Sequence, residues 1–223
     1  MQSNYISCVA KRTMELHEAL TQISEIRQQL ARSEIYRGYR SLTTSVSGLL
    51  AILGAVLQPL FVASPDSELG RYLIFWIGIA AISAIVVGSE VWWRTRRTDS
   101  EALRQMTWLA VEQLSPSLVV GALLTLCIFQ AAPEVSWMFP GLWALIFSLG
   151  VFASHRLLPP ASLWVALYYA SCGLGCLYWG QGANALSPWQ MGISFGGGQL
   201  MSAAILFWTL ERAQSRCALT EVP

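Results

Sequence analysis

The chain has 223 residues, of which 54% are hydrophobic and only 12% are charged. So little charge excludes an ordinary soluble domain or a disordered protein, and indicates a chain that lies in a lipid bilayer. The net charge of +1 gives no indication of a nucleic-acid partner. Membrane lipid is therefore the first partner we expect.

Residues 1–41 form a polar N-terminal segment that we predict to be cytoplasmic. Roughly forty mostly polar residues precede the first apolar run, which is unlike a secretory signal peptide. Within this segment residues 13–40 carry apolar side chains at helical spacing, at Leu16, Leu20, Ile23, Ile26 and Leu30. This spacing predicts an amphipathic helix that lies on the membrane or on a partner. Its end supplies an expected interfacial anchor of Arg37, Tyr39 and Arg40.

Residues 42–210 contain six apolar stretches, each near the length of about 20 residues that a spanning helix needs. They are residues 42–63, 72–93, 116–133, 140–158, 160–180 and 190–210. Pro116, Pro140 and the pair Pro159 and Pro160 are expected to mark helix starts, where a missing N–H does little harm. The predicted fold is therefore all-α, a polytopic membrane bundle of six transmembrane helices, with a short cytoplasmic tail at 211–223.

The positions of the cationic residues predict the orientation of these helices. With six spans, every lysine and arginine except Arg71 falls on the same side of the membrane. Cytoplasmic loops carry the excess of such residues, so both termini are expected in the cytoplasm. The opposite loops, at 64–71, 134–139 and 181–189, are too short for a folded receptor domain.

Residues 99–115 form a second expected cytoplasmic helix between the second and third spans. Asp99 or Ser100 is a suitable cap, and Leu103, Met106 and Leu114 fall on one side of the helix. We expect this helix to rest at the inner membrane surface.

Small residues at four-residue spacing predict close helix packing in the membrane. The sixth span has the clearest series, Gly192, Gly196, Gly197, Gly198 and Ser202. Weaker series occur at Ser47, Ala51 and Ala55, and at Ala80, Ala84 and Gly88. Packing within one bundle is the favoured interpretation, and a homodimer contact or a mobile hinge is the alternative.

The polar residues within the spans are few. Glu90 and Arg94 are four residues apart and are expected to form an ion pair near the inner boundary. Gln199, Ser148, Thr125 and Tyr168 are neutral groups that can line a small cavity or bond to one another across helices. No charge is predicted near the centre of the bilayer, which argues against a proton relay.

No pattern in the chain indicates catalysis. Residues 192–196 match GxSxG, which is similar to a motif of serine hydrolases, and six spans resemble rhomboid-type proteases. However, Ser194 is predicted near the outer surface, while the two histidines, His17 and His155, are predicted on the inner side. Cys172 and Cys176 share a helical face but lack further metal ligands at that depth. We therefore expect no catalytic residue, metal or cofactor.

The chain resembles a group of bacterial multi-pass membrane proteins without established activity. The resemblance is carried by residues 20–56, 114–119, 140–144 and 192–199. It implies a bacterial inner-membrane location and assigns no role to any residue.

Two functions follow as hypotheses. The first is a non-enzymatic sensor, scaffold or accessory subunit whose cytoplasmic helices contact a protein partner in the cytoplasm or the membrane. The alternative is a small dimeric transporter or channel for a neutral or weakly polar solute.

Overall fold

The computed structural model describes residues 41–62, 64–65, 67–97, 101–156 and 160–208, and these residues form helices and no strand. The all-α prediction is thus confirmed for them. The long helices are α2 (Ser41–Phe61), α3 (Leu69–Arg97), α4 (Glu101–Ala131), α5 (Phe139–Ala153) and α6 (Ser162–Trp179). The last long segment consists of α7 (Pro188–Met191), the π-helical η4 (Gly192–Gly197) and α8 (Gly198–Leu206). Short 3-10 turns are η1 (Pro133–Met138), η2 (Ser154–Arg156) and η3 (Gly182–Asn184).

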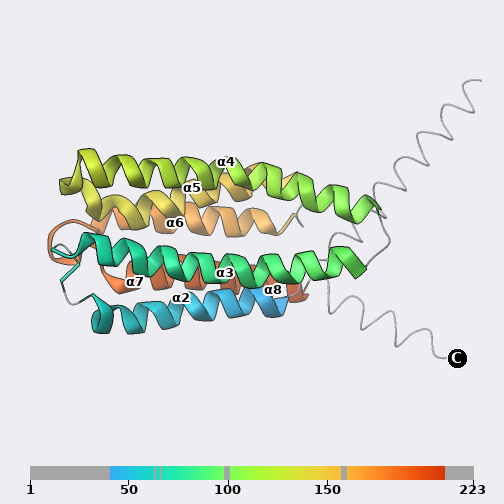
Figure 1. Ribbon diagram of the computed structural model, residues 1–223, viewed down its shortest axis with the longest axis horizontal. Coiled ribbons are helices and arrows are strands. Elements are labelled where there is room, and N and C mark those ends of the chain that lie inside the picture. The colour runs from blue at the N-terminus through green and yellow to red at the C-terminus, as the bar shows by residue number, and fades with distance from the viewer. Residues whose placement is uncertain (1–40, 63, 66, 98–100, 157–159, 209–223) are drawn as a thin grey trace, which may run out of the picture.

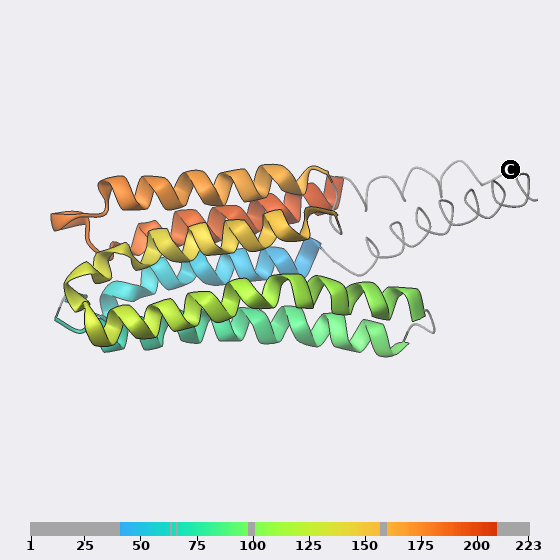
Figure 2. The same ribbon diagram turned by 90° about the horizontal axis from the view of Figure 1, so that it is seen from above.

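The helices form an elongated bundle of two layers. Figures 1 and 2 show α4, α5 and α6 in one layer and α3, α2 and α8 in the other, with successive helices antiparallel. Within the layers α5 packs against α4 and α6, and α2 packs against α3 and α8. The layers meet mainly where α6 contacts η4 and α8. We call the end with the α2–α3 connection the outer end and the opposite one the inner end.

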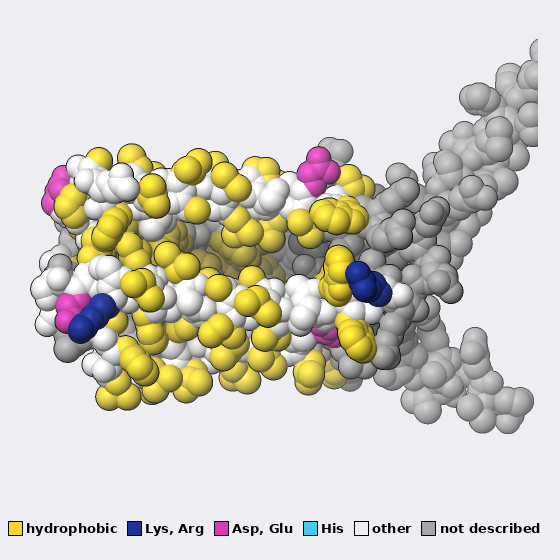
Figure 3. Space-filling view, in the orientation of Figure 1, with side chains coloured by type: hydrophobic (Ala, Val, Ile, Leu, Met, Phe, Trp, Pro, Cys, Tyr) yellow, Lys and Arg dark blue, Asp and Glu magenta, His cyan; other side chains and the backbone are white. Residues whose placement is uncertain are grey.

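Four helical stretches are long and apolar enough to cross a membrane. They are Ser41–Phe61, Leu69–Trp93, Val111–Ala131 and Pro133–Ala153. The space-filling view agrees, because charged side chains on the visible face lie at the two ends and hydrophobic side chains cover the band between them (Figure 3). The chain is therefore a multi-pass membrane protein by the length and composition of its helices.

The predicted small-residue series of the first and last spans pack against each other. A Cβ added to Gly192 would lie 2.7 Å from the Cβ of Ala55, and one added to Gly196 would lie 2.6 Å from Cγ1 of Ile52. Gly48 of α2 likewise approaches the Gly196 carbonyl, 3.1 Å from an added Cβ. These glycines thus allow η4 to approach α2 within one chain, which is the packing interpretation favoured by the sequence.

A second close crossing joins α5 and α6. A Cβ added to Gly141 would meet the Gly173 carbonyl at 2.9 Å, and one added to Gly173 would meet the Gly141 carbonyl at the same distance. Side chains at either position would force the helices apart, so this pair allows the close crossing of α5 and α6.

The two layers are joined near the outer end by a buried apolar cluster. It includes Tyr72 and Trp76 of α3, Ile128 of α4, Phe139 of α5 and Leu186 of the α6–α7 connection. Since these residues come from almost every long segment, the bundle is closed there. The helices α3 and α4 make little contact with each other, and Figure 3 shows a hollow between the two layers.

The structure corrects the prediction of a separate helix over 99–115. The chain is one continuous helix, α4, from Glu101 to Ala131, and Pro116 lies inside it rather than at a helix start. A proline removes the hydrogen bond to the carbonyl four residues earlier, here that of Glu112. The Ser115 hydroxyl donates a bond of 3.1 Å to this same carbonyl, which explains how the helix continues.

Several predictions lie outside the described residues. These are the amphipathic helix at 13–40, its anchor of Arg37, Tyr39 and Arg40, and the tail at 211–223. The side chain of Arg94 also lies outside them, so the expected pair with Glu90 stays a prediction.

Candidate functional site

The π-helical segment η4 is the most irregular part of the bundle. The sequence predicts an ordinary helix here, but residues Gly192–Gly197 widen into a π-helix. The Tyr168 hydroxyl of α6 donates a hydrogen bond of 2.7 Å to the Ile193 carbonyl within it. The hydroxyl also occupies the space that a side chain at Gly197 would need. Widened turns of this kind are frequent at functional sites, so we describe the surrounding residues in detail.

Tyr169 packs beside Gly198 in the same way as Tyr168 packs beside Gly197. Tyr169 is fully buried, and its ring fills the space beside Gly198. The ring also packs against Phe147 and Phe195, at centroid distances of 4.8 and 5.6 Å. The two glycines thus allow α6 to insert both tyrosine rings against the last segment.

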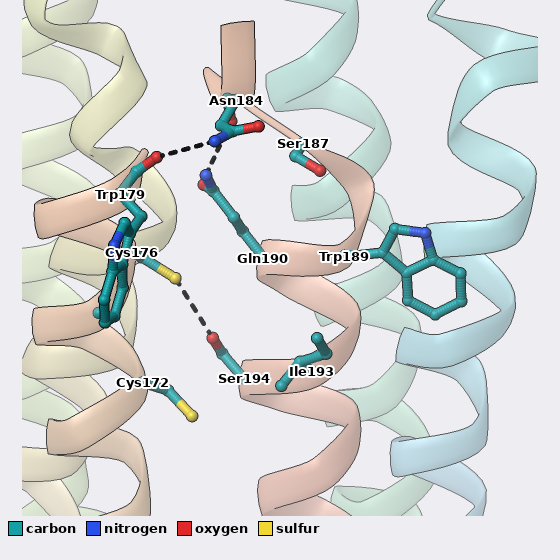
Figure 4. A pocket seen from close by; sticks show the side chains of 10 residues that line it. Cys172, Cys176, Trp179, Asn184, Ser187, Trp189, Gln190, Ile193 and Ser194 are labelled. Carbon is teal, nitrogen blue, oxygen red and sulfur yellow. Dashed lines mark hydrogen bonds between the residues drawn. The ribbon is translucent and has the colours of Figure 1, made fainter. Parts of the chain in front are cut away.

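A cavity of about 420 Å³ opens beside this region, between α6 and the segment formed by α7 and η4 (Figure 4). Its lining comes from three consecutive parts of the chain: the end of α6, the loop that follows, and the start of the last segment. The lining residues are Cys172, Gly175, Cys176, Trp179, Asn184, Ser187, Trp189, Gln190, Ile193 and Ser194. We call this the outer cavity.

Polar groups of the outer cavity form two separate sets of contacts. The Cys176 sulfur lies 3.7 Å from the Ser194 hydroxyl oxygen, and this contact links α6 to η4. Nearer the outer end, Gln190 donates from Nε2 to the Asn184 carbonyl at 2.8 Å. Asn184 in turn donates to the Trp179 carbonyl at 3.3 Å. None of the lining residues is Asp, Glu, Lys, Arg or His, so the cavity is mostly apolar, with a few neutral polar groups and no fixed charge.

The loop beside the cavity is held by a buried amide. Gln58 of α2 is 1% exposed and donates from Nε2 to the Leu186 carbonyl at 3.1 Å. Its Oε1 accepts a bond of 2.9 Å from the indole nitrogen of Trp76. Leu186 is fully buried with a φ of 52°, a left-handed conformation that a leucine adopts only under constraint. Gln58 therefore holds a strained loop against α2 and α3.

The four predicted cavity residues lie elsewhere, and three of them bond to other elements. Ser148 donates to the Ala166 carbonyl at 2.8 Å, and Thr125 accepts from the Trp143 indole at 2.8 Å. Tyr168 bonds to Ile193 as described, and Gln199 faces Tyr169. None of the four lines the outer cavity. These bonds correspond to the cross-helix alternative that the sequence also offered.

Ser194 has no base beside it among the described residues. It is 1% exposed, and the side chain near its hydroxyl is the Cys176 thiol. His155 lies in η2 at the inner end, where its Nδ1 is 2.7 Å from the Phe152 carbonyl. A nucleophilic serine needs a base within hydrogen-bond reach. The surroundings of Ser194 therefore do not make it a nucleophile.

The structure also shows an exposed surface that belongs to α3 and α4. Of the apolar span in α3, 17% is buried, and of that in α4 only 6%, compared with 39% for α2. No residue from Ala80 to Ser89 is buried, so the series of Ala80, Ala84 and Gly88 faces outward. A Cβ added to Gly88 would meet nothing within 4 Å. We call the exposed faces of these two helices the α3–α4 surface.

The inner end of this surface carries tryptophan and polar groups. Trp92, Trp93 and Trp108 are 58%, 61% and 66% exposed, and the Arg96 guanidinium lies 4.4 Å from the Trp92 ring centroid. Such residues mark the boundary of the bilayer. The Gln113 Oε1 is buried and has no hydrogen-bond partner within the described part of the chain. Figure 2 shows that α3 and α4 extend past the inner ends of the other helices.

Comparison with known proteins gives no relative from which a function can be transferred. No family model, curated protein or solved structure matches the chain.

The residues that line the outer cavity or hold its loop were not predicted from the sequence. Gln58, Asn184 and Gln190 were not selected, and Ser194 and Cys176 were considered only as a nucleophile and a metal ligand. An isolated glutamine within the first apolar span was the available signal, because a polar amide in a membrane helix usually has a specific partner.

Proposed function

We propose that the chain crosses a bacterial inner membrane six times, with both termini in the cytoplasm. The support is that α6 and the last segment run alongside the four spans and complete an antiparallel series (Figures 1 and 2). With 18 residues, α6 has a length of about 27 Å, close to the thickness of the bilayer core. A π-helix keeps its backbone hydrogen bonds within the segment, so η4 is compatible with crossing.

Within that frame we propose that the protein is a non-enzymatic scaffold or accessory subunit that binds a membrane protein partner through the α3–α4 surface. One observation carries this proposal: the apolar spans of the two longest helices are almost unburied, with the series Ala80, Ala84 and Gly88 of α3 facing outward. Series of small residues let another helix approach closely. The residues at 13–40 and the first turns of α4 are the proposed cytoplasmic part of the same contact.

A further feature favours a protein partner over lipid alone at this surface. Both α3 and α4 extend beyond the other described helices, where a bilayer would not cover them (Figure 2). A partner that contacts this part of the surface would pack against it.

The test uses two matched glycines of α3. Gly88 and Gly70 both have open space where a side chain would be added, so Gly88→Leu and Gly70→Leu should fold equally well. Gly70 lies at the outer end of α3, away from the inner end of the α3–α4 surface. A photoreactive phenylalanine analogue at Trp93 is used in living cells to crosslink the partner.

We expect a discrete crosslinked product that persists in Gly70→Leu and is reduced at least tenfold in Gly88→Leu. The same analogue placed at Leu174, which is 60% exposed on α6, should give no such product. Equal products for all variants, or lipid adducts alone, would contradict the proposal. A product with twice the mass of this chain would identify the partner as a second copy.

A further inference from the structure

The outer cavity is separate from the α3–α4 surface, and the proposed function leaves it unused. We propose that it binds a small neutral amphiphile, a molecule with an uncharged, hydrogen-bond-donating head and an apolar body. The proposal rests on the cavity's walls, on one buried acceptor and on the position of its opening.

The walls exclude a charged head group. A cavity without acidic or basic side chains offers no compensation for an ion, and moving an uncompensated charge out of water is strongly unfavourable. Neutral hydroxyl, thiol and amide groups are present instead, at Ser194, Cys176 and Gln190. Pockets that combine apolar walls with a few such groups are typical of small-molecule sites, and 420 Å³ lies within their usual range.

The acceptor is Oε1 of Gln190. Because Nε2 of this side chain donates to the Asn184 carbonyl, the orientation of the amide is fixed and Oε1 is left as an acceptor. This oxygen is buried and has no hydrogen-bond partner among the described residues. A ligand with a hydroxyl or N–H group would satisfy it, and Figure 4 shows Gln190 reaching between α6 and η4 towards Asn184.

The opening indicates that the ligand arrives from the outer leaflet. Trp179 and Trp189 line the cavity and are 68% and 55% exposed. Exposed tryptophans lie at the level of the lipid head groups, with apolar chains below them. Ile193 also lines the cavity and is 57% exposed, which leaves an apolar side open towards the chains. An amphiphile can therefore place its head at Gln190 and its body along Ile193.

The probe for the test is a medium-chain alkanol that carries an aliphatic diazirine. The full-length protein is purified in nanodiscs, irradiated with increasing probe, and digested for mapping by mass spectrometry. We expect saturable adducts within residues 172–179 and 187–194. Excess 1-decanol should displace the probe, decanoate should need at least tenfold more, and glycerol should have no effect.

Two variants test the site itself. Gln190→Leu removes the acceptor at similar size and should weaken probe binding about tenfold, while Ile193→Trp fills the opening from an exposed position and should abolish saturable labelling. Leu174→Trp, on a face of α6 that does not line the cavity, is the matched control and should label normally. The thermal unfolding temperature of each variant checks that it is folded.

Unsaturable labelling spread over the lipid-facing helices would overturn the proposal. Equal displacement by decanoate would overturn the neutral head group, and displacement by glycerol would instead assign the cavity to a water-borne polyol. Labelling that stays normal in a folded Ile193→Trp variant would show that the ligand binds elsewhere. None of these outcomes depends on whether Gly88 contacts a partner.

Discussion

Replacing Gln58 with leucine should strongly destabilise the outer end of the bundle. The substitution keeps the approximate size of the side chain but removes both hydrogen bonds, to the Leu186 carbonyl and from the Trp76 indole. Trp76 is 2% exposed and Leu186 fully buried, so water does not replace the lost partner at either residue.

The expected loss of stability follows from the two groups that are left without a partner, the Leu186 carbonyl and the Trp76 indole N–H. A buried donor or acceptor that loses its partner costs about 1–3 kcal/mol, so two of them give about 2–6 kcal/mol. In bilayers single side-chain bonds have been worth only about 0.6–1.7 kcal/mol, which favours the lower part of this range. We therefore expect Gln58→Leu to lower the free energy of unfolding by about 2–3 kcal/mol, taking both principles together.

The assay is reversible unfolding in mixed micelles by increasing the fraction of sodium dodecyl sulfate. A double-mutant cycle with Trp76→Phe isolates the indole bond, because the second substitution removes the donor that Gln58→Leu leaves unpaired. Ser89→Ala is the control, since that exposed hydroxyl donates to the Val86 carbonyl of its own helix. A loss below about 0.5 kcal/mol for Gln58→Leu, the level of ordinary surface changes, would refute the reasoning.

Other contacts give further predictions. Gly173→Leu should lower the free energy of unfolding by about 3 kcal/mol or prevent folding, because the added side chain would collide with the Gly141 carbonyl of α5. The yield of folded protein measures this effect. Tyr168→Phe should cost about 1 kcal/mol and speed amide exchange in η4 through loss of its bond to Ile193, measurable by mass spectrometry. Thr125→Val should cost about 1 kcal/mol by orphaning the Trp143 indole, and an unchanged unfolding midpoint would contradict this.

The positions of the helices were predictable from the sequence because they depend on local hydropathy. Pro140 begins a helix as expected, since a proline in the first turn has no intrahelical partner to lose. Pro116, which was expected to begin a helix by the same rule, lies inside α4 instead. The difference lies in Ser115, whose side chain bonds to the carbonyl that the proline leaves free.

The outer cavity could not be predicted because its geometry depends on distant contacts. The loop that borders it is held by Gln58, 128 residues away from Leu186 in the sequence. The π-helix similarly depends on Tyr168, which lies 25 residues before Ile193 and fits only beside a glycine. Periodicity within one segment contains no information on such pairs.

The exposure of the α3–α4 surface was also beyond sequence reasoning. The series Ala80, Ala84 and Gly88 has the same spacing as Ser47, Ala51 and Ala55, and both predict helix packing. The structure buries Ser47, Ala51 and Ala55 against the last segment and leaves the α3 series facing outward. The arrangement of the two layers decides which of these small-residue series is covered by another helix, and the spacing within one helix does not contain that information.

The central claim of six crossings is best tested by the accessibility of single cysteines in intact cells. In a background without native cysteines, Ser67→Cys, His155→Cys and Ala183→Cys place thiols at exposed positions of the α2–α3, α5–α6 and α6–α7 connections. A membrane-impermeant maleimide should label positions 67 and 183 from outside and position 155 only after the membrane is permeabilised. Labelling of position 183 only after permeabilisation would show that α6 and the last segment do not cross, and would leave four spans.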